Sequence, residues 1–124
     1  MSSRTITAAA RFALVAAVAA VTWLATTDRA LPELASVSDK LNHVFAFLVL
    51  GLLADRSFPQ TRFGLPKIAA LVAYGAAIEA LQYFLPHREA SCPDLVADAA
   101  GVALYAAARP LLLTIPVLRP PPNR

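Results

Sequence analysis

Four apolar segments follow one another along the chain, separated by short polar stretches that hold most of the charged residues and several prolines. A helix that crosses a membrane needs roughly 20 apolar residues to span about 30 Å of hydrocarbon. The pattern therefore predicts an all-α fold, a polytopic membrane bundle of about four transmembrane helices. The apolar segments are Phe12–Thr27, Leu41–Ala54, Ile68–Leu85 and Leu95–Ala108.

The second and fourth segments are shorter than a full span. Each reaches spanning length if its polar flanks join the helix, with Lys and Arg side chains extending to the interface. The fourth segment continues past Arg109 and Pro110, where we expect the helix to be distorted. Arg4 and Arg11 could mark the first segment as a cleaved signal peptide. We favour a retained helix, because no clean small-x-small cleavage site follows it.

Small residues recur at every fourth position in the third and fourth segments. This spacing lets helix backbones approach closely in lipid, although an alanine-rich composition explains either row about as well. The rows are Ala69, Ala73 and Ala77, and Ala99, Ala103 and Ala107.

The composition agrees with a membrane protein. Hydrophobic residues make up 58% of the 124 residues and charged residues only 15%, whereas ordinary soluble domains are about 25% charged. The net charge of +3 fits membrane topology better than nucleic-acid binding, because the charges lie between the apolar segments, and we expect no nucleic-acid partner. The single cysteine, Cys92, cannot form an internal disulfide.

The distribution of Lys and Arg predicts the orientation, because cytoplasmic loops carry an excess of both. With four spans, the two termini and the loop between the second and third segments share one side. That side is the more basic, so both termini are expected in the cytoplasm and the chain in the plasma (inner) membrane. A disordered tail, residues 116–124, is expected to follow a transmembrane domain, residues 1–115. The cytoplasmic side would hold Arg4, Arg11, Arg56, Arg62, Lys67, Arg109, Arg119 and Arg124, and the other side Arg29, Lys40 and Arg88.

Three of the segments place ionisable residues near the predicted outer boundary. At 1.5 Å per residue, His43, Glu79 and Asp98 lie at depths that agree to within about one helical turn. We therefore expect one polar cleft in the outer leaflet, and nothing comparable at the inner face. Its residues would be Asp39, Lys40 and His43 of the second segment, Glu79 and Gln82 of the third, Arg88 of the following loop, and Asp94 and Asp98 of the fourth.

Acidic residues are costly to bury in lipid, about 2.5–3.5 kcal/mol at mid-bilayer on insertion scales, and such residues are functional by default. We treat Glu79, His43 and Asp98 as candidate catalytic residues, with Glu79 or His43 as a general base assisted by a carboxylate. The alternative is that they only join the helices, where an interhelical hydrogen bond contributes about 0.6 kcal/mol on average. The candidate binding residues are Asp39, Lys40, Gln82, Arg88 and Asp94.

Simpler roles exist for several of these residues. Lys40 could anchor a helix end at the headgroups, which we favour for it, and Asp94 could be the N-cap of the fourth helix. His43 could be an ordinary packing residue. We expect no metal site, because the histidine and acids lack local ligand spacing, and the sequence identifies no cofactor.

Four motifs in order resemble the VanZ-like family of small bacterial membrane proteins. The family pattern has a DKxxH opening, an ExxQ helix, a PGR turn and a helix with DxxxNxxG or DxxxDxxG. The resemblance covers Asp39 to Tyr105 and departs from the pattern at His87, where the family has glycine. It implies a polytopic membrane protein and leaves the biochemistry open. The matching residues are Asp39-Lys40-x-x-His43, Glu79-x-x-Gln82, Pro86-x-Arg88 and Asp94-x-x-x-Asp98-x-x-Gly101.

These observations lead to one expected function and two alternatives. We expect a cell-envelope membrane protein whose outer-leaflet cleft binds or processes the headgroup of a membrane lipid or lipid-linked amphiphile. The first alternative is a non-catalytic accessory or structural membrane subunit. The second, a small transporter with the acids as a proton relay, is less favoured because the polar residues lie on one side only. Catalysis and oligomeric state stay open.

Overall fold

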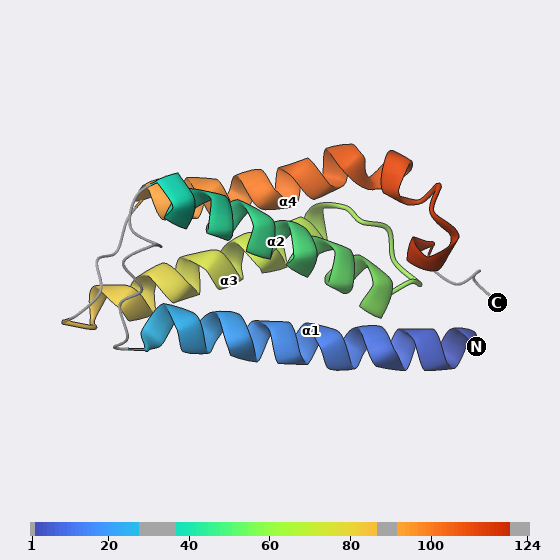
Figure 1. Ribbon diagram of the computed structural model, residues 1–124, viewed down its shortest axis with the longest axis horizontal. Coiled ribbons are helices and arrows are strands. Elements are labelled where there is room, and N and C mark those ends of the chain that lie inside the picture. The colour runs from blue at the N-terminus through green and yellow to red at the C-terminus, as the bar shows by residue number, and fades with distance from the viewer. Residues whose placement is uncertain (1, 28–36, 87–91, 120–124) are drawn as a thin grey trace.

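The computed structural model describes residues 2–27, 37–86 and 92–119. For residues 37–39 it describes the backbone only. Within these ranges the chain forms four α-helices and no strand, so the all-α prediction is confirmed. The helices run alternately in opposite directions, and α1 therefore begins at the end of the bundle where α4 finishes (Figure 1). The elements are α1 (Ser3–Thr26), α2 (Val37–Ser57), α3 (Leu65–Tyr83), α4 (Cys92–Leu112) and the short 3-10 helix η2 (Pro116–Leu118).

Two of the four helices, α2 and α4, extend beyond both ends of their apolar segments, whereas α1 and α3 begin before their segments begin and end before their segments end. α1 starts in polar sequence because the Ser2 side chain accepts a hydrogen bond from the Thr5 N–H at 3.2 Å, a common N-cap arrangement. α2 and α4 take in their polar flanks and reach 21 residues each. The predicted lengthening is therefore confirmed, and α4 continues through Pro110, which lies near its C-terminal end.

The packed core lies mainly between α2 and α4, the two helices in most extensive contact. Phe47 and Leu50 of α2 and Val102 of α4 are 2%, 1% and 1% exposed. Ala54 of α2 and Leu71 of α3 complete this core. In lipid such helix packing depends on close van der Waals contact rather than on the hydrophobic effect.

Glycine makes the closest approach between α2 and α4. A Cβ placed on Gly101 would lie 2.3 Å from the backbone oxygen of Val44, a separation that only rearrangement of α2 could relieve. The alanine rows do not have this role within the chain. The α3 row is wholly exposed, and in the α4 row Ala99 is half-buried while Ala103 and Ala107 are exposed.

α1 packs against α2 and α3 through polar contacts as well as apolar ones. The Tyr74 hydroxyl donates to the Val18 backbone oxygen at 3.1 Å and lies 2.7 Å from Thr22 Oγ1. Nearer the other end, Arg11 Nε donates to the Ser57 backbone oxygen at 2.9 Å. These contacts make α1 an integral part of the bundle. Its retention in the mature protein stays a prediction.

Two helices of the described part, α1 and α4, are long and apolar enough to cross a membrane. This finding rests on length and composition, and a signal sequence or a buried core helix can satisfy the same criteria. α2 carries charged residues on both sides of its apolar run, and α3 carries Glu79 within its run. The number of spans therefore stays a prediction.

A short 3-10 helix follows α4. Pro116–Leu118 forms η2, and Arg56 of α2 donates to the Val117 backbone oxygen. The disordered tail, residues 116–124, stays a prediction. Residues 120–124 lie outside the described residues.

Candidate functional site

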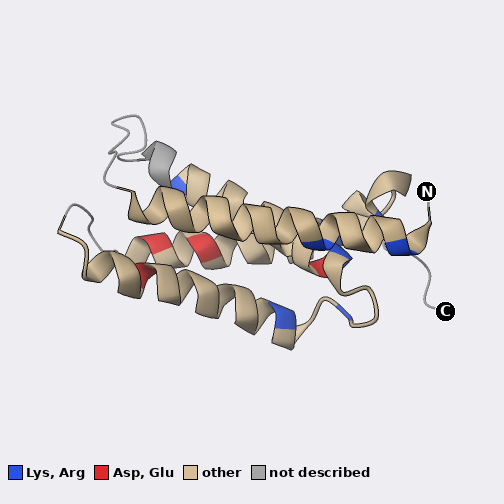
Figure 2. Ribbon diagram, turned by 90° about the horizontal axis from the view of Figure 1, so that it is seen from below, with Lys and Arg blue, Asp and Glu red and all other residues tan. Residues whose placement is uncertain are grey.

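Acidic and basic positions collect at opposite ends of the bundle (Figure 2). The end where α1 begins carries most of the Lys and Arg positions, and the acidic positions of α3 and α4 lie toward the other end. The predicted site residues that lie in helices belong to the acidic end, because they occupy the starts of α2 and α4 and the last part of α3.

His43 of α2 and Asp98 of α4 form the central contact of this end. His43 Nδ1 lies 2.6 Å from Asp98 Oδ1. Asp98 is 0% exposed, whereas the His43 side chain is 18% exposed. A buried carboxylate hydrogen-bonded to one ring nitrogen fixes the orientation of an imidazole.

An ion pair between Lys40 and Asp94 lies beside this contact. The Lys40 side chain is 40% exposed, and Asp94 Oδ2 also lies 4.0 Å from His43 Nε2. Two acids from α4 therefore face two basic side chains from α2. Because Asp94 lies inside the first turn of α4, the prediction that it is the N-cap is wrong.

α3 packs against the pair from a third direction. A Cβ on Gly75 would lie 2.9 Å from Asp98 Oδ2, so the α3 backbone lies directly against the buried carboxylate. Glu79 is half-buried one turn further along α3, on the same helical face as Gly75. The α2, α3 and α4 helices therefore meet at Asp98, and a site shared by His43, Glu79 and Asp98 stays a prediction.

Gln82 of α3 is buried, and its side chain forms a hydrogen bond with α1. Its Nε2 donates to the Ala25 backbone oxygen at 3.1 Å. Its Oε1 is buried and has no hydrogen-bond partner among the described residues. Buried acceptors are nearly always satisfied, so this oxygen is available to a water or a ligand donor.

Two predicted binding residues cannot be placed with the others. The Asp39 backbone belongs to the first turn of α2, but its side chain lies outside the described part of the chain. Arg88 lies outside the described residues altogether, as does the neighbouring His87. The functional roles of these residues, and of Lys40, His43, Glu79, Gln82, Asp94 and Asp98, stay predictions.

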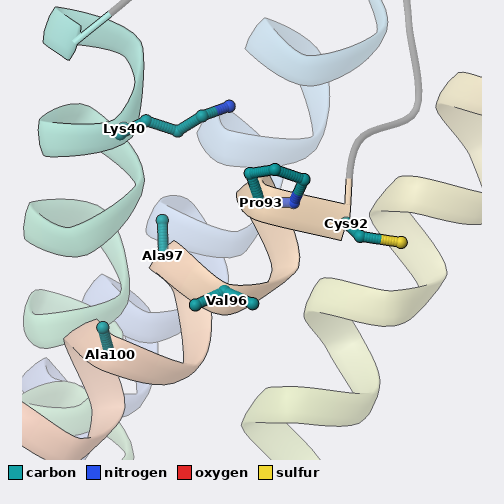
Figure 3. Close-up of a pocket in the computed structure, with 6 residues that line it drawn as sticks. All are labelled: Lys40, Cys92, Pro93, Val96, Ala97 and Ala100. Carbon is teal, nitrogen blue, oxygen red and sulfur yellow. The ribbon is translucent and has the colours of Figure 1, made fainter.

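A shallow, open groove of about 490 Å³ lies beside the polar cluster, between the starts of α2 and α4. Its lining is almost wholly apolar apart from Lys40 at one edge (Figure 3). Among the described residues, His43 contacts Asp98 and lies near Asp94, and none of these three lines this groove. The open polar cleft stays a prediction. The lining residues of the groove are Lys40, Cys92, Pro93, Val96, Ala97 and Ala100.

A family model described as VanZ/LLP1 matches residues 3–113. The chain belongs to the VanZ/LLP1 family. The match includes all four helices, and so extends to α1, where the sequence resembled the family only in hydrophobicity. No curated protein and no solved structure matches the chain. VanZ/LLP1 membership and the two long apolar helices together indicate a membrane protein.

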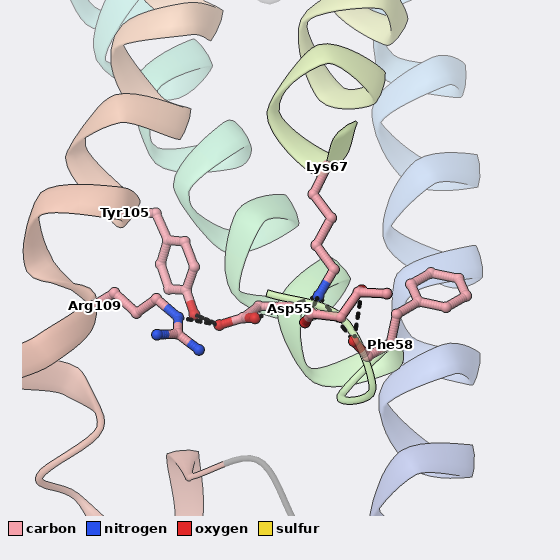
Figure 4. Close-up of polar contacts among 6 residues, drawn as sticks. Asp55, Phe58, Lys67, Tyr105 and Arg109 are labelled. Atoms are coloured by element: carbon pink, nitrogen blue, oxygen red, sulfur yellow. Dashed lines mark hydrogen bonds and ion pairs between the residues drawn. The ribbon is translucent and has the colours of Figure 1, made fainter. Parts of the chain in front are cut away.

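This VanZ/LLP1 chain has a second polar cluster, at the basic end, where the sequence analysis expected none. Its centre is Asp55, which is 2% exposed. Asp55 Oδ2 accepts hydrogen bonds from the Tyr105 hydroxyl at 2.6 Å and from Arg109 Nε at 2.7 Å (Figure 4). Lys67 Nζ lies 3.5 Å from Asp55 Oδ1 and donates to the Phe58 backbone oxygen at 2.8 Å. The expectation that ionisable residues gather at one end of the bundle only is therefore wrong.

One sequence signal pointed to this cluster. Tyr105 and Arg109 are four residues apart on α4 and so share a helical face with Asp98 and Gly101. Asp55 was not among the predicted site residues, because it directly follows the apolar run that ends at Ala54. Extending α2 by one turn converts it into a helix residue that faces α4.

Among the described residues, no group of three or more His, Cys, Asp or Glu side chains is arranged to hold a metal ion. An imidazole held by a carboxylate, an exposed ammonium group and an adjoining apolar surface can bind an anionic amphiphile or transfer a proton.

Proposed function

We propose that this VanZ/LLP1 protein is a four-span protein of the plasma (inner) membrane that binds the polar headgroup of a lipid or lipid-linked amphiphile in the outer leaflet. One observation carries the proposal: partly exposed Lys40 stands at the edge of an apolar groove and next to the His43–Asp98 pair. An amphiphile needs such a combination, since its headgroup requires fixed polar partners and its tail an apolar surface.

The surface of the bundle supports its placement in lipid. Phe12, Phe45 and Phe84 are 78%, 68% and 79% exposed, and they lie on three different helices or their ends. Large aromatic side chains exposed on several sides are unfavourable in water and indicate contact with lipid or a partner. Trp23 and Tyr83, 59% and 75% exposed near the acidic end, fit the aromatic belt of a membrane interface.

The charges support the orientation. The described Lys and Arg residues of the turn between α2 and α3, and of the chain ends, lie at one end of the bundle (Figure 2). Because basic residues favour the cytoplasmic side, this arrangement supports cytoplasmic termini. The polar site would then face the outer leaflet.

The site also suggests how a ligand would be handled. Lys40 would attract an anionic group of the headgroup, and His43 would donate to it or remove a proton from it, held in position by Asp98. Glu79 would supply a second carboxylate from α3. Whether the protein only binds the headgroup or also changes it depends on this proton transfer.

A non-catalytic accessory role is the second candidate, and a specific observation favours it. Asp98 is 0% exposed and Lys40 is already paired with Asp94, so both contacts join α2 to α4 without a ligand. The transporter alternative was less favoured because polar residues were expected on one side only. Polar clusters occur at both ends of the bundle, so this objection no longer applies. It stays less favoured because the apolar core of Phe47, Leu50 and Val102 lies between the clusters.

Native mass spectrometry of the detergent-purified protein tests the proposal. We expect the wild type to retain a lipid or amphiphile, and both Lys40→Gln and His43→Gln to retain less of it. Arg62→Gln, at the opposite end of the bundle, is the matched control for loss of a charge. Equal retention by all four proteins, or no retention by the wild type, would count against a headgroup site at Lys40 and His43.

A further inference from the structure

The basic end of the bundle carries more positive charge than its described acid can neutralise. Asp55 is the one acidic residue of the described part at this end, and it contacts both Lys67 and Arg109. One carboxylate can neutralise one of these two cations, which leaves a surplus charge within the Asp55 cluster. The other basic residues at this end are Arg4 and Arg11 of α1, Arg56 of α2, Arg62 of the following turn, and Arg119 after η2.

Arg56 is the most unusual of these cations, because it is only 8% exposed. Its one described hydrogen bond runs to a neutral acceptor, the backbone oxygen of Val117. No described acidic residue forms an ion pair with it. A guanidinium group has five N–H donors, and a buried cation without a counter-charge is strongly unfavourable. Arg56 is therefore a largely buried positive charge without an anionic partner in the part of the chain that the structure describes.

The residue after Arg56 adds a second unsatisfied group. Ser57 is 0% exposed, and its Oγ has no hydrogen-bond partner among the described residues. Arg11 Nε is bonded to the Ser57 backbone oxygen, which brings a further cation to the end of α2. A hydroxyl and guanidinium groups with spare donors are the groups that bind phosphate oxygens.

We propose that Arg56, with Ser57 and Arg11 beside it, binds the phosphate of an anionic phospholipid in the leaflet that meets the basic end. A lipid is the favoured source of the phosphate because Arg56 lies in the last turn of α2, where the apolar helix surface ends and headgroups begin. Basic pockets between helices on the cytoplasmic side suit anionic headgroups. This site is separate from the polar site at Lys40 and His43 and does not depend on its function.

Thermal melting in detergent with added lipid tests the proposal. Phosphatidylglycerol should raise the melting temperature of the wild type, and phosphatidylcholine should not. Arg56→Gln should reduce the apparent affinity for phosphatidylglycerol by about tenfold or more, since it removes a buried charge-assisted contact. The exposed control Arg62→Gln should reduce it by about fivefold at most, the effect of one cation near a charged surface.

Arg56→Gln should also melt at or above the wild-type temperature in phosphatidylcholine, because it removes an uncompensated buried charge. If the glutamine variant does not fold, Arg56→Lys keeps the charge with fewer donors and should lose part of the affinity. Equal losses in Arg56→Gln and Arg62→Gln would overturn the site in favour of a diffuse surface charge. The same stabilisation by inorganic phosphate alone would overturn the assignment to a lipid.

Discussion

His43 Nδ1 of α2 lies 2.6 Å from Asp98 Oδ1 of α4, so a partly exposed imidazole is held by a fully buried carboxylate. Removing one partner of a buried charged pair typically costs about 3–5 kcal/mol. We expect Asp98→Ala to lower the free energy of unfolding by about 3 kcal/mol. The measurement is the melting temperature of the purified protein in detergent.

Asp94→Ala is the control for this substitution. The partner of Asp94 is Lys40, whose side chain is 40% exposed, and exposed pairs contribute about 1 kcal/mol or less. We therefore expect a much smaller effect on the melting temperature. Similar losses in the two variants would show that Asp98 has no special place in the bundle.

Glu79→Gln separates a chemical role of this residue from a structural one. Glutamine keeps the shape and hydrogen-bonding capacity of the side chain but removes its charge and its proton chemistry. We expect the variant to stay folded at normal abundance, with an equal or higher melting temperature, and to lose the phenotype of the intact protein. Complementation of a deletion strain, measured beside thermal melting, provides the comparison.

Glu79→Asp serves as the charge-retaining control and should keep at least part of the activity. Full complementation by Glu79→Gln would remove Glu79 from the proposed chemistry. The non-catalytic accessory role would then be the better description of the protein.

Fusion reporters test the orientation. Alkaline phosphatase fused after Arg124 should be inactive, because the enzyme folds only outside the cytoplasm and both termini are predicted inside. A fusion within Pro86–Cys92 should be active. A fusion in the turn between α2 and α3, after Thr61, should be inactive as well. The opposite pattern would place the polar site at the inner leaflet.

Gly101 should not tolerate a side chain. A Cβ there would meet the Val44 backbone oxygen at 2.3 Å, and overpacking of this kind costs about 1–3 kcal/mol or more. We expect Gly101→Val to reduce the melting temperature and the yield of folded protein. Ala103→Val, an exposed position on the same helix, adds comparable bulk and should leave both unchanged.

The helices were predictable from sequence because long apolar runs between charged stretches have few other solutions in a membrane protein. The meeting of His43 with Asp98 could be anticipated from helix direction and rise alone. The Asp55 cluster could not be anticipated in this way, because it depends on how far α2 continues beyond its apolar run. It also depends on the register of α2 against α4, which is set by the contact at Gly101.

Helix ends were the least predictable feature for a related reason. Asp94 was expected to cap α4, but the helix begins at Cys92 and the acid became a partner of Lys40. The tail from Pro116 onward is predicted to be disordered from its composition, and Arg56 contacts Val117 within it. In both places the structure has a long-range contact that is invisible in the local sequence.

The interface between α2 and α4 has a polar side-chain contact near each end and a close glycine contact between them. His43 bonds Asp98 near one end, Asp55 bonds Arg109 near the other, and Gly101 receives the α2 backbone in between. A shift of α4 along α2 by one helical turn would break both hydrogen bonds and would move Gly101 away from the α2 backbone. We therefore expect α2 and α4 to move as one unit, and any motion that accompanies ligand binding to occur in α1 or α3.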